Sequence, residues 1–581
     1  MSFKGRATWG GRAVFAFIAL FIASPGVWAQ VAPAEQRLID RQINQIQQRE
    51  QQRLDEWDKE RGQRGAVPGG LPIPPAPSQD ESASSVCFIL HSVVFTGADH
   101  LSEADQKDLL APYVGRCIKL AEADAIVRAV TDLYGARGAV TTRAYIPPQD
   151  VSSGHLQIIV VEGRIQGFLW NDEPADQRRE IGMAFPAKPG DVLDLRDLEQ
   201  GIDQLNRLPS NDAKLKLIPG EQPGQTLIVI ENQPKKPWRV SAGLDNSGQR
   251  STGEIQESYT AELDDALGLN ETIALRHGRD RLHNSSERSS RNWSLNASIP
   301  KGYWEMTTAL SYMQYRSVVY GQGQSFQTWG VQRNAKVGLN RVIHRDDVGK
   351  TTAGASLAYK SLGNDVMGAR TDASSPKLTV LGFSMDHARR LAGGVLRGAL
   401  EYDAGISAFG ARNDASWSTS PKAQFTKYQA DLSYGLPVSF AGLDWSWSSS
   451  AHGQWSTDSL YSTEQISIGG TSSVRGYKDQ VLQGNRGAYW RNEVSLALPT
   501  GIPDIDDTLG ALQPFIGYDI GVIANFHPES SQPGKLSGWG TGLRLAGPWL
   551  KAEFSYAWAL SHPSITAPRS NELALSLTLT Y

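Results

Sequence analysis

The longest regular pattern in the chain is an alternation of apolar with small or polar residues between Trp238 and Tyr581. At its end, leucines occupy every second position from Leu573 to Leu579. A period of two predicts β-strands with one apolar and one polar face. Strands whose apolar faces carry aromatic ends are typical of a membrane β-barrel with a water-filled lumen. A soluble β-sandwich also alternates, but the aromatic ends and the lack of helical patterns here favour the barrel.

The pattern before this region is different and predicts two small α+β modules between about Val86 and Pro234. Apolar residues recur at helical spacing in two places, and short alternating runs surround them. The order β-α-α-β-β occurs once clearly and once approximately, which indicates an internal repeat. The expected elements are strands over 88–95, 140–146 and 155–161 with helices starting near Ser102 and covering 123–134, then a helix over 195–205 with strands over 213–218 and 226–230.

Three segments precede the modules. Residues 1–29 combine basic residues, a short apolar run and a small-residue cleavage site after Ala29, which is the pattern of a signal peptide. Residues 30–61 place a thin apolar stripe at helical spacing on a very polar surface, so this helix could lie in solvent or inside a polar channel. Residues 62–85 are rich in Pro and Gly and predict an extended linker.

Composition narrows the classes of function. A net charge of −4 over 581 residues provides no basic field for nucleic acid. No apolar run of about 18 residues follows the N-terminus, which excludes a bundle of transmembrane helices. The segment Val348–Thr351 lacks the leading glycine and the strand–helix context of a phosphate loop, and no zinc-protease or serine-hydrolase motif occurs. We therefore expect no enzyme activity, no catalytic residues and no cofactor.

The two cysteines, Cys87 and Cys117, predict a disulfide, because the chain carries an export signal. Two separate buried thiols are the alternative. Closing a loop of this length would remove roughly 3–4 kcal/mol of unfolded-state entropy. A metal site is not expected, since no further Cys or His lies at zinc-like spacing.

Several segments resemble the outer-membrane transporters of two-partner secretion, the TpsB proteins. The run from Tyr134 to Gly163 is similar to their first POTRA module, although Ala139 stands where the family usually has an aromatic residue. The other matching segments are Leu195–Gln200 and Arg207–Asn211 of a second POTRA module, Asp265–Asn270 of an early periplasmic turn, and Val474, Arg475, Gly476 and Tyr477, which follow Ile468–Gly470 and resemble the tip of the family's pore loop.

The resemblance implies a membrane β-barrel of 16 antiparallel strands, two periplasmic α+β POTRA modules, an N-terminal plug helix and a loop that folds inward after the eleventh strand. The corresponding segments are a signal peptide (1–29), a plug helix (30–61), a linker (62–85), POTRA 1 (86–163), POTRA 2 (164–235) and the barrel (236–581), with the inward-folded loop at about 454–486.

The run Phe515–Gly521 is similar to the family's inner-wall motif, whose acidic residue pairs with the loop arginine. Alternation along a strand puts Phe515, Gly517 and Asp519 on the lumen side. The resemblance therefore implies that Asp519 holds Arg475, and the alternative is that each is an independent lumen charge. Two further inward-facing candidates for this network are Arg491 and Glu493.

The implied function is a pore in the outer membrane of a Gram-negative bacterium, with its POTRA modules in the periplasm. It would recognise an unfolded partner exoprotein through these modules and secrete it without ATP. The partner would be an adhesin, a haemolysin or a contact-dependent inhibition toxin. We also expect contact with outer-membrane lipids, barrel-assembly machinery during biogenesis, a monomeric state and no nucleic acid.

Two other functions remain open at this point. An outer-membrane protein insertase shares POTRA modules and the arginine loop, but the two modules, the N-terminal helix and the Pro-rich linker argue against it. A passive porin is disfavoured, because a porin has no use for such modules.

Overall fold

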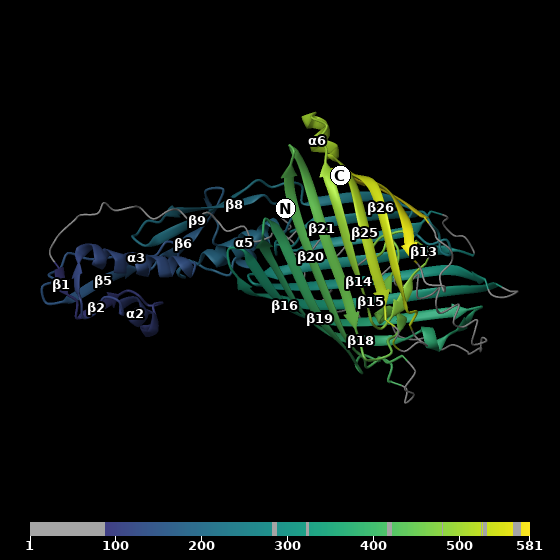
Figure 1. Ribbon diagram of the computed structural model, residues 1–581, viewed down its shortest axis with the longest axis horizontal. Coiled ribbons are helices and arrows are strands. Elements are labelled where there is room, and N and C mark those ends of the chain that lie inside the picture. The colour runs from purple at the N-terminus through teal and green to yellow at the C-terminus, as the bar shows by residue number, and fades with distance from the viewer. Residues whose placement is uncertain are drawn as a thin grey trace, which may run out of the picture.

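The computed structural model describes residues 87–281, 287–320, 325–414, 421–478, 480–524, 526, 531–561 and 571–581. The expected signal peptide (1–29), plug helix (30–61) and linker (62–85) lie outside these residues. The described chain forms a closed β-barrel and two small α+β modules that extend from one end of it (Figure 1). No helix in this part of the chain has the length and apolar character needed to cross a membrane.

The first module packs two helices against short strands. Helix α2 (Glu103–Leu110) begins at a capping box formed by Ser102 and Asp105. Helix α3 (Leu120–Ala136) buries one apolar face, from Ala123 to Tyr134, against Leu156 and Ile158. The strands form one sheet of order β2-β5-β4 and a separate pair, β1-β3. Their bounds are β1 (Cys87–Ile89), β2 (Ser92–Thr96), β3 (Cys117–Lys119), β4 (Arg143–Tyr145) and β5 (His155–Val161).

Two expected strands of this module are wrong in detail. The single strand over 88–95 is two strands, because the amides of Leu90 and His91 donate to the carbonyls of Arg116 and Gly154, so the chain changes partners there. The strand over 140–146 is shortened to β4, because the amide of Thr142 bonds to the carbonyl of Ala139 in a turn. Both differences come from tertiary hydrogen bonds that alternation alone does not encode.

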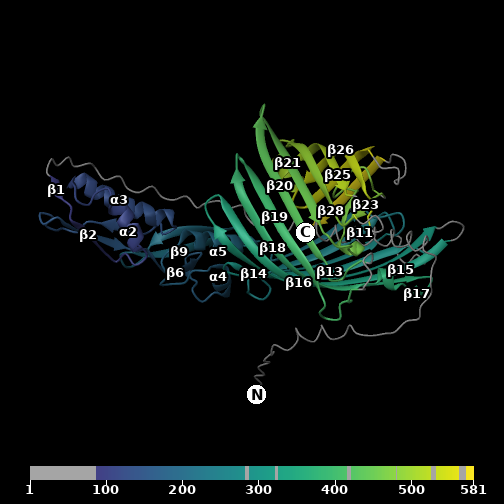
Figure 2. The same ribbon diagram turned by 60° about the horizontal axis from the view of Figure 1, so that its bottom comes forward.

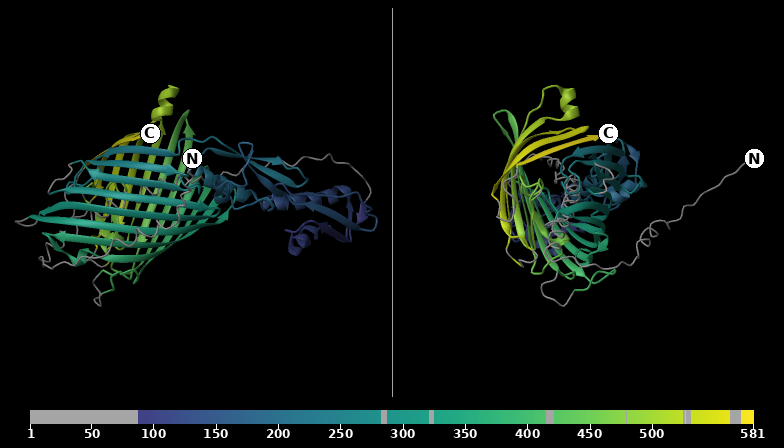
Figure 3. Two further views of the ribbon diagram at one scale, coloured as in Figure 1. Left: turned by 180° about the vertical axis from the view of Figure 1, so that it is seen from behind. Right: turned by 90° about the vertical axis from the view of Figure 1, so that its right-hand side faces the viewer.

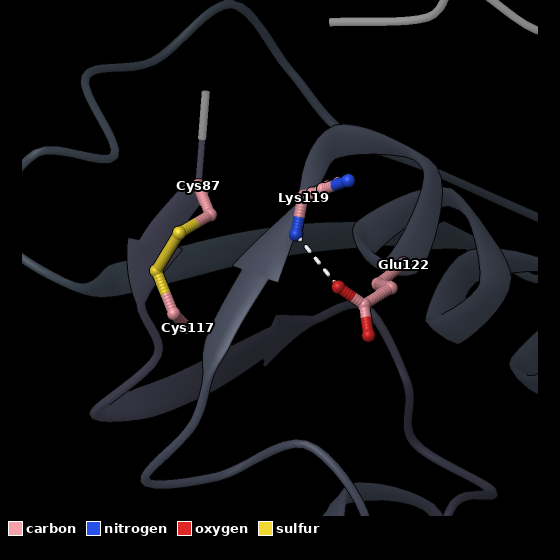
Figure 4. The surroundings of a disulfide bond; sticks show 4 residues. All are labelled: Cys87, Cys117, Lys119 and Glu122. Carbon is pink, nitrogen blue, oxygen red and sulfur yellow. Dashed lines mark hydrogen bonds between the residues drawn. A yellow bond between two sulfur atoms is a disulfide. The ribbon is translucent and has the colours of Figure 1, made fainter. Parts of the chain in front are cut away.

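The predicted disulfide is confirmed. Cys87 and Cys117 are bonded across the β1–β3 pair, with their Cα atoms 5.5 Å apart (Figure 4). Next to it, Glu122 accepts a hydrogen bond from the backbone amide of Lys119 at 2.8 Å and caps the first turn of α3. The cross-link therefore joins the first strand of the module to the start of its longer helix.

The second module repeats the arrangement of the first. Its sheet has the order β7-β6-β9-β8, with β6 parallel to β9 and β8 antiparallel to β9, as β2, β5 and β4 are in the first module. The expected helix and the two closing strands are present, whereas β6, β7 and α4 were not predicted. The elements are β6 (Arg164–Trp170), β7 (Glu173–Pro174), α4 (Arg179–Ala184), α5 (Leu195–Asn206), β8 (Ala213–Pro219) and β9 (Gln225–Asn232).

Sixteen long antiparallel strands of the described chain close the barrel, which confirms the expected architecture. The short β17 (Ala369–Arg370) folds back on β16, and β10 pairs with β28 to complete the ring. The strands are β10 (Trp238–Asp245), β11 (Gln256–Asp264), β12 (Thr272–Asp280), β13 (Ser289–Lys301), β14 (Trp304–Tyr320), β15 (Ser325–Arg345), β16 (Gly349–Val366), β18 (Lys377–Leu391), β19 (Gly394–Ile406), β20 (Thr426–Phe440), β21 (Leu443–Trp455), β24 (Gly487–Ala497), β25 (Leu512–Ile523), β26 (Gly534–Ala546), β27 (Leu550–Ser561) and β28 (Asn571–Thr580).

The two ends of the barrel differ. We call the end that faces the modules the module end and the opposite end the far end (Figures 1, 2 and 3). The turns after β11, β13 and β15 lie at the module end, together with α6 (Pro503–Leu509), the helix between β24 and β25, which projects from the barrel (Figure 1). The C-terminal Tyr581 is also at the module end, where its ring contacts Trp238 and Trp549.

The outer face of the barrel is apolar and ends in aromatic residues, as expected for strands in lipid. Leu573, Leu575, Leu577 and Leu579 of β28 are all exposed on this face. Near the far end, aromatic or imidazole rings stand opposite one another across neighbouring strands and form rows. The rows are Tyr259, His277, Trp293 and Tyr312 on β11–β14, then Tyr402, Tyr428 and Trp455 on β19–β21, and Tyr518, Trp539 and Trp558 on β25–β27.

The disulfide gives the first test. Replacing both cysteines, Cys87→Ser with Cys117→Ser, should lower the free energy of unfolding of the first module by about 3 kcal/mol, because the cross-link restricts the unfolded chain. The bonded cysteines are 30 residues apart. Limited proteolysis of the full-length protein at increasing urea would measure this, with cleavage in the second module as the internal reference. An unchanged urea midpoint for the first module would contradict the prediction.

Candidate functional site

The segment between β21 and β24 returns into the barrel from the far end. It follows the eleventh long strand and carries η2 (Ser462–Glu464), β22 (Ile466–Ile468) and β23 (Leu482–Gly484), the last two paired as a small hairpin. Its apolar residues are buried against the inner wall, in a cluster that includes Val474, Tyr477 and Leu536. We call this segment, described except for residue 479, the inward loop.

Arg475 is clasped by the wall at the turn of this loop. Its guanidinium donates from Nε to Oδ2 of Asp519 at 2.7 Å and from Nη2 to Oδ1 at 2.8 Å, and the Arg475 amide donates to Oδ2 at 3.1 Å. Asp519 is fully buried. A bidentate pair with a third bond from the backbone fixes both the position and the orientation of the loop.

The other three residues of the motif pack around this pair. Val474 is fully buried in the loop cluster, and the Tyr477 hydroxyl donates to the carbonyl of Ser537 at 2.7 Å and also contacts that of Ser561. Gly476 donates its amide to Oε2 of Glu572 at 3.0 Å. Its φ of 95° lies in the left-handed region, and a Cβ there would meet the backbone of β27, so glycine is required.

Of the inner-wall residues, Gly517 faces Arg475 directly and Phe515 does not. A Cβ on Gly517 would occupy the position of the Arg475 guanidinium, so glycine is what admits the arginine. Phe515 is buried on the same face, but its ring lies under the guanidinium of Arg544, 4.6 Å away. Phe515 therefore supports a neighbouring cation, which sequence reasoning did not identify.

A chain of charges continues from the clasp along the wall. Glu493 accepts from Nη1 of Arg475 at 2.9 Å and from Nη1 of Arg544 at 3.1 Å, and Glu553 binds Nε of Arg544 at 3.0 Å. Arg491 lies 3.7 Å from Asp519 and donates to a loop carbonyl. The two residues that sequence analysis suggests for this network, Arg491 and Glu493, thus both contact the clasp. Sequence analysis does not identify Arg544 and Glu553, although alternation along β26 and β27 would have placed both side chains on the lumen side.

A second ion cluster holds the first limb of the loop, and sequence analysis does not predict it. The fully buried carboxylate of Glu464 accepts from Lys360 of β16 at 2.6 Å and from Lys427 of β20 at 3.0 Å. Lys427 also lies 3.1 Å from Asp403 of β19. An apolar group around Phe425 and Leu460 packs beside it. We call this the Glu464 anchor.

The loop therefore joins two different sectors of the barrel wall. The Glu464 anchor belongs to β16–β20, and the Arg475 clasp belongs to β24–β25 with support from β26 and β27. Beneath the loop lies a lumen cavity of about 1190 Å³, which both Glu464 and Arg491 line. The same cavity reaches Asp203 and Arg207 of the second module at the module end. The loop thus lines the far side of a polar lumen whose near side is lined by α5.

Helix α5 seats the second module on the barrel rim. Arg345, at the end of β15, binds Glu199 at 3.2 Å and Asp203 at 2.6 Å. Gln200 and Gln204 both donate to the carbonyl of Gly302, in the turn after β13, at 3.1 Å. These polar contacts run along one face of α5, so the helix lies across the module end with a defined orientation.

Arg207 also contacts the barrel, at the turn after β11 and on β13. Its guanidinium donates to the carbonyl of Asn270 and to Oγ of Ser298, each at 2.5 Å. On α5 itself, burial raises the pKa of Asp197, although a hydrogen bond from the hydroxyl of Tyr303 at 2.6 Å opposes the shift. Two of the segments that resembled the family, Leu195–Gln200 and Asp265–Asn270, therefore lie on the two sides of one interface.

A membrane β-barrel with a loop clasped to its inner wall and two α+β modules at one end defines a POTRA-bearing outer-membrane pore. Residues 224–545 match the family described as haemolysin secretion/activation protein ShlB/FhaC/HecB. Residues 88–163 match the ShlB-type POTRA domain, and residues 164–219 match a POTRA domain. The chain belongs to this family of transporters.

Individual relatives agree with this assignment. The chain is 34% identical to outer membrane transporter CdiB of Escherichia coli, over 90% of this chain and 87% of that protein. It is 31% identical to hemolysin transporter protein ShlB of Serratia marcescens, over 85% of this chain and 86% of that protein. These names describe transporters, which favours secretion over the insertase alternative.

Solved structures give the same result. The fold matches CdiB from Escherichia coli with a TM-score of 0.82 and 31% identity, covering 95% of this chain and all (100%) of that one. CdiB from Acinetobacter baumannii matches in fold with a TM-score of 0.76 at 20% identity, over 95% of this chain and 100% of that one. The protein is thus an outer-membrane transporter of two-partner secretion, its module end in the periplasm and its far end outside.

The Glu464 anchor can be tested separately from the clasp. Glu464→Gln should loosen the first limb, because Lys360 and Lys427 would lose their shared carboxylate; breaking a buried pair costs about 3–5 kcal/mol. A cysteine placed at the buried loop residue Ser467 should then react faster with a maleimide. Glu262→Gln is the matched control, since Glu262 lines the lumen but pairs with Arg239, away from the loop. Equal labelling rates in all three proteins would contradict the prediction.

Proposed function

We propose that the protein secretes one large partner exoprotein, which it captures unfolded in the periplasm through its POTRA modules and passes through the barrel to the cell surface without ATP. The observation that carries this proposal is the inward loop across the lumen, held by the Arg475 clasp and the Glu464 anchor. In this position the loop restricts passage through the barrel until a client arrives.

The chemistry of the attachments suits a reversible gate. Buried ion pairs contribute little net stability, because the charges lose hydration when they are buried and regain it when they separate. A loop held by Arg475 and Glu464 is therefore well positioned while it is closed, yet its release into a wet lumen exposes groups that water stabilises. The folding of the exoprotein at the cell surface would supply the direction of transport.

Capture requires an accessible strand edge, and β8 of the second module offers one. Ala213 exchanges both of its backbone hydrogen bonds with the side chain of Asn206 and not with β9. By alternation along an antiparallel strand, the N–H and C=O groups of Leu215 and Leu217 also point away from β9. An extended peptide can add to such an edge through its main chain, which tolerates many side-chain sequences.

The remaining parts fit the same scheme. The helix expected over residues 30–61 is polar on most of its surface, which suits a plug inside a charged lumen. We infer a monomer, because the lumen, the loop and both modules belong to one chain, and we infer insertion by the barrel-assembly machinery. The identity to CdiB transporters favours a contact-dependent inhibition exoprotein as the cargo over a haemolysin or another adhesin.

A secretion assay tests the function. The protein would be co-expressed with a large exported protein encoded beside it, and that protein would be measured in the medium and at the cell surface. Arg475→Ala should abolish most of the release, because it removes the clasp without touching the lipid face. Arg341→Ala is the control, since Arg341 lies on the outer face over Trp304. Heat-modifiable gel mobility would verify that each barrel is folded.

Two outcomes would overturn the proposal. Normal release of the exoprotein by the Arg475→Ala variant would show that secretion does not depend on the clasp. A stably expressed partner that stays in the periplasm, while other outer-membrane proteins lose their assembly, would establish an insertase instead.

Site-specific photo-crosslinking tests capture at β8. A crosslinker at Lys216, an exposed residue of this edge strand, should capture the exoprotein during secretion. The same group at Glu173 is the matched control, because β7 forms the opposite edge of the sheet. Crosslinking of equal yield at both positions, or at Glu173 alone, would refute capture by this edge.

A further inference from the structure

Four arginines face outward near the far end of β12–β15. Each shares its side of the strand with exposed apolar residues: Arg279 with Leu275, Arg291 with Trp293, Arg316 with Leu310 and Arg333 with Val337. We call these four residues, Arg279, Arg291, Arg316 and Arg333, the arginine patch. It lies outside the barrel, so it has no part in the clasp or in the lumen.

The register places like charges side by side. Arg279 of β12 stands directly opposite Arg291 of β13, and Arg291 stands opposite Gln314 of β14. Opposed like charges on one face of a sheet are destabilising. Glu257 pairs with Arg279 at 3.1 Å, while Arg291 donates to the neutral Oε1 of Gln314 at 3.0 Å.

Arg316 extends the positive charge toward the outside. It lies two residues beyond Gln314 on β14 and has no carboxylate partner among the described residues. Asp365, an acid on the outer face, lies a strand further away, opposite Trp329, which itself stands opposite Arg316. Among the described residues, Arg291 and Arg316 therefore have no carboxylate partner, which leaves positive charge on this outer surface.

The aromatic rows indicate where the arginine patch lies along the membrane normal. Trp304, near the module end of β14, and Tyr312, in the far-end row, are eight residues apart on the same face. That is about 27 Å along the strand and roughly 20 Å along the membrane normal after tilt, close to the apolar band of an outer-membrane barrel. Arg291 and Arg316 lie just beyond Tyr312, at the level of lipid headgroups outside the cell.

We propose that the arginine patch binds the phosphate groups of a phosphorylated glycolipid of the outer leaflet, of the lipid A class. Guanidinium groups engage phosphate oxygens in a bidentate manner, and an anion between Arg279 and Arg291 removes their mutual repulsion. The acyl chains would lie on the apolar surface below, along Leu275, Leu295 and Leu310. The inference rests on the outer-membrane location and is independent of the secretion mechanism.

Native mass spectrometry of the purified full-length protein in detergent tests this site. The probes are lipid A with both phosphates, lipid A without phosphates, and phosphatidylglycerol. The wild type should bind bisphosphorylated lipid A at least about tenfold more tightly than either other lipid. The triple variant Arg279→Gln, Arg291→Gln, Arg316→Gln should lose this preference.

Two further variants test whether the lipid preference depends on the position and the geometry of these arginines. Arg341→Gln removes an outward-facing arginine at the opposite end of β15 and should keep the full preference. Replacing the same three arginines by lysine keeps the charge without the bidentate geometry and should give an intermediate preference. If the triple glutamine variant fails the heat-modifiability test for folding, the single variant Arg316→Gln, which removes no ion pair, carries the measurement.

Three results would overturn the proposal. The first is a wild type that does not discriminate between the lipids. The second is a folded glutamine variant that keeps the preference. The third is phosphatidylglycerol that binds as tightly as lipid A with the same dependence on the three arginines, because that result would define a general anionic surface.

Discussion

The charge-assisted pair between Arg475 and Asp519 is the interaction on which the arrangement of the lumen depends. A guanidinium can occupy the inner wall only where the facing strands leave room, and Gly517 and Gly538 provide that room. A side chain at Gly517 would displace the guanidinium, and one at Gly538 would displace the carbonyl of Arg475. The glycines, the carboxylate and the loop arginine thus form one unit, although they are distant in the sequence.

The inward loop is attached to the barrel wall at two places, so neither its turn nor its first limb moves freely in the lumen. The Arg475 clasp fixes its turn to β24–β25, and the Glu464 anchor fixes its first limb to β16 and β20. Both are ionic, and both border a polar lumen, so the loop can separate from one sector while the other still holds it. A tip that swings from the Glu464 anchor would open the lumen without withdrawing the whole loop, which would require the loss of both ion clusters together.

Much of this molecule was predictable because its elements obey short-range periodicity. Alternation identified the barrel, and the same parity put Phe515, Gly517 and Asp519 on the inner face, where the structure has them buried. The capping box at Ser102 located α2 correctly, since a cap depends only on neighbouring residues. The pairing of Arg475 with Asp519 came from the family resemblance, because periodicity says which way a side chain points but not what it meets.

The parts that were missed depend on register and on contacts between domains. Glu464 is one acidic residue in a long loop, and only the folded barrel brings Lys360 and Lys427 to it. Arg544 contacts Glu493 across two strand pairings, each with its own register. The single strand expected over 88–95 failed for a related reason, since the hydrogen bonds to Arg116 and Gly154 are tertiary.

Helix α5 shows how the periplasmic and membrane parts are joined physically. Its apolar face, with Leu198 and Leu205, belongs to the core of the second module, so the helix cannot leave the barrel rim without moving that module. Its polar face is bound by Arg345 and by the Gly302 carbonyl, and Asp203 also lines the lumen cavity. Through this one helix, the position of the second module is coupled directly to the module end of the lumen. A client that displaces the second module would break polar contacts on that one face, and these can be replaced by water, whereas the apolar core of the module stays intact.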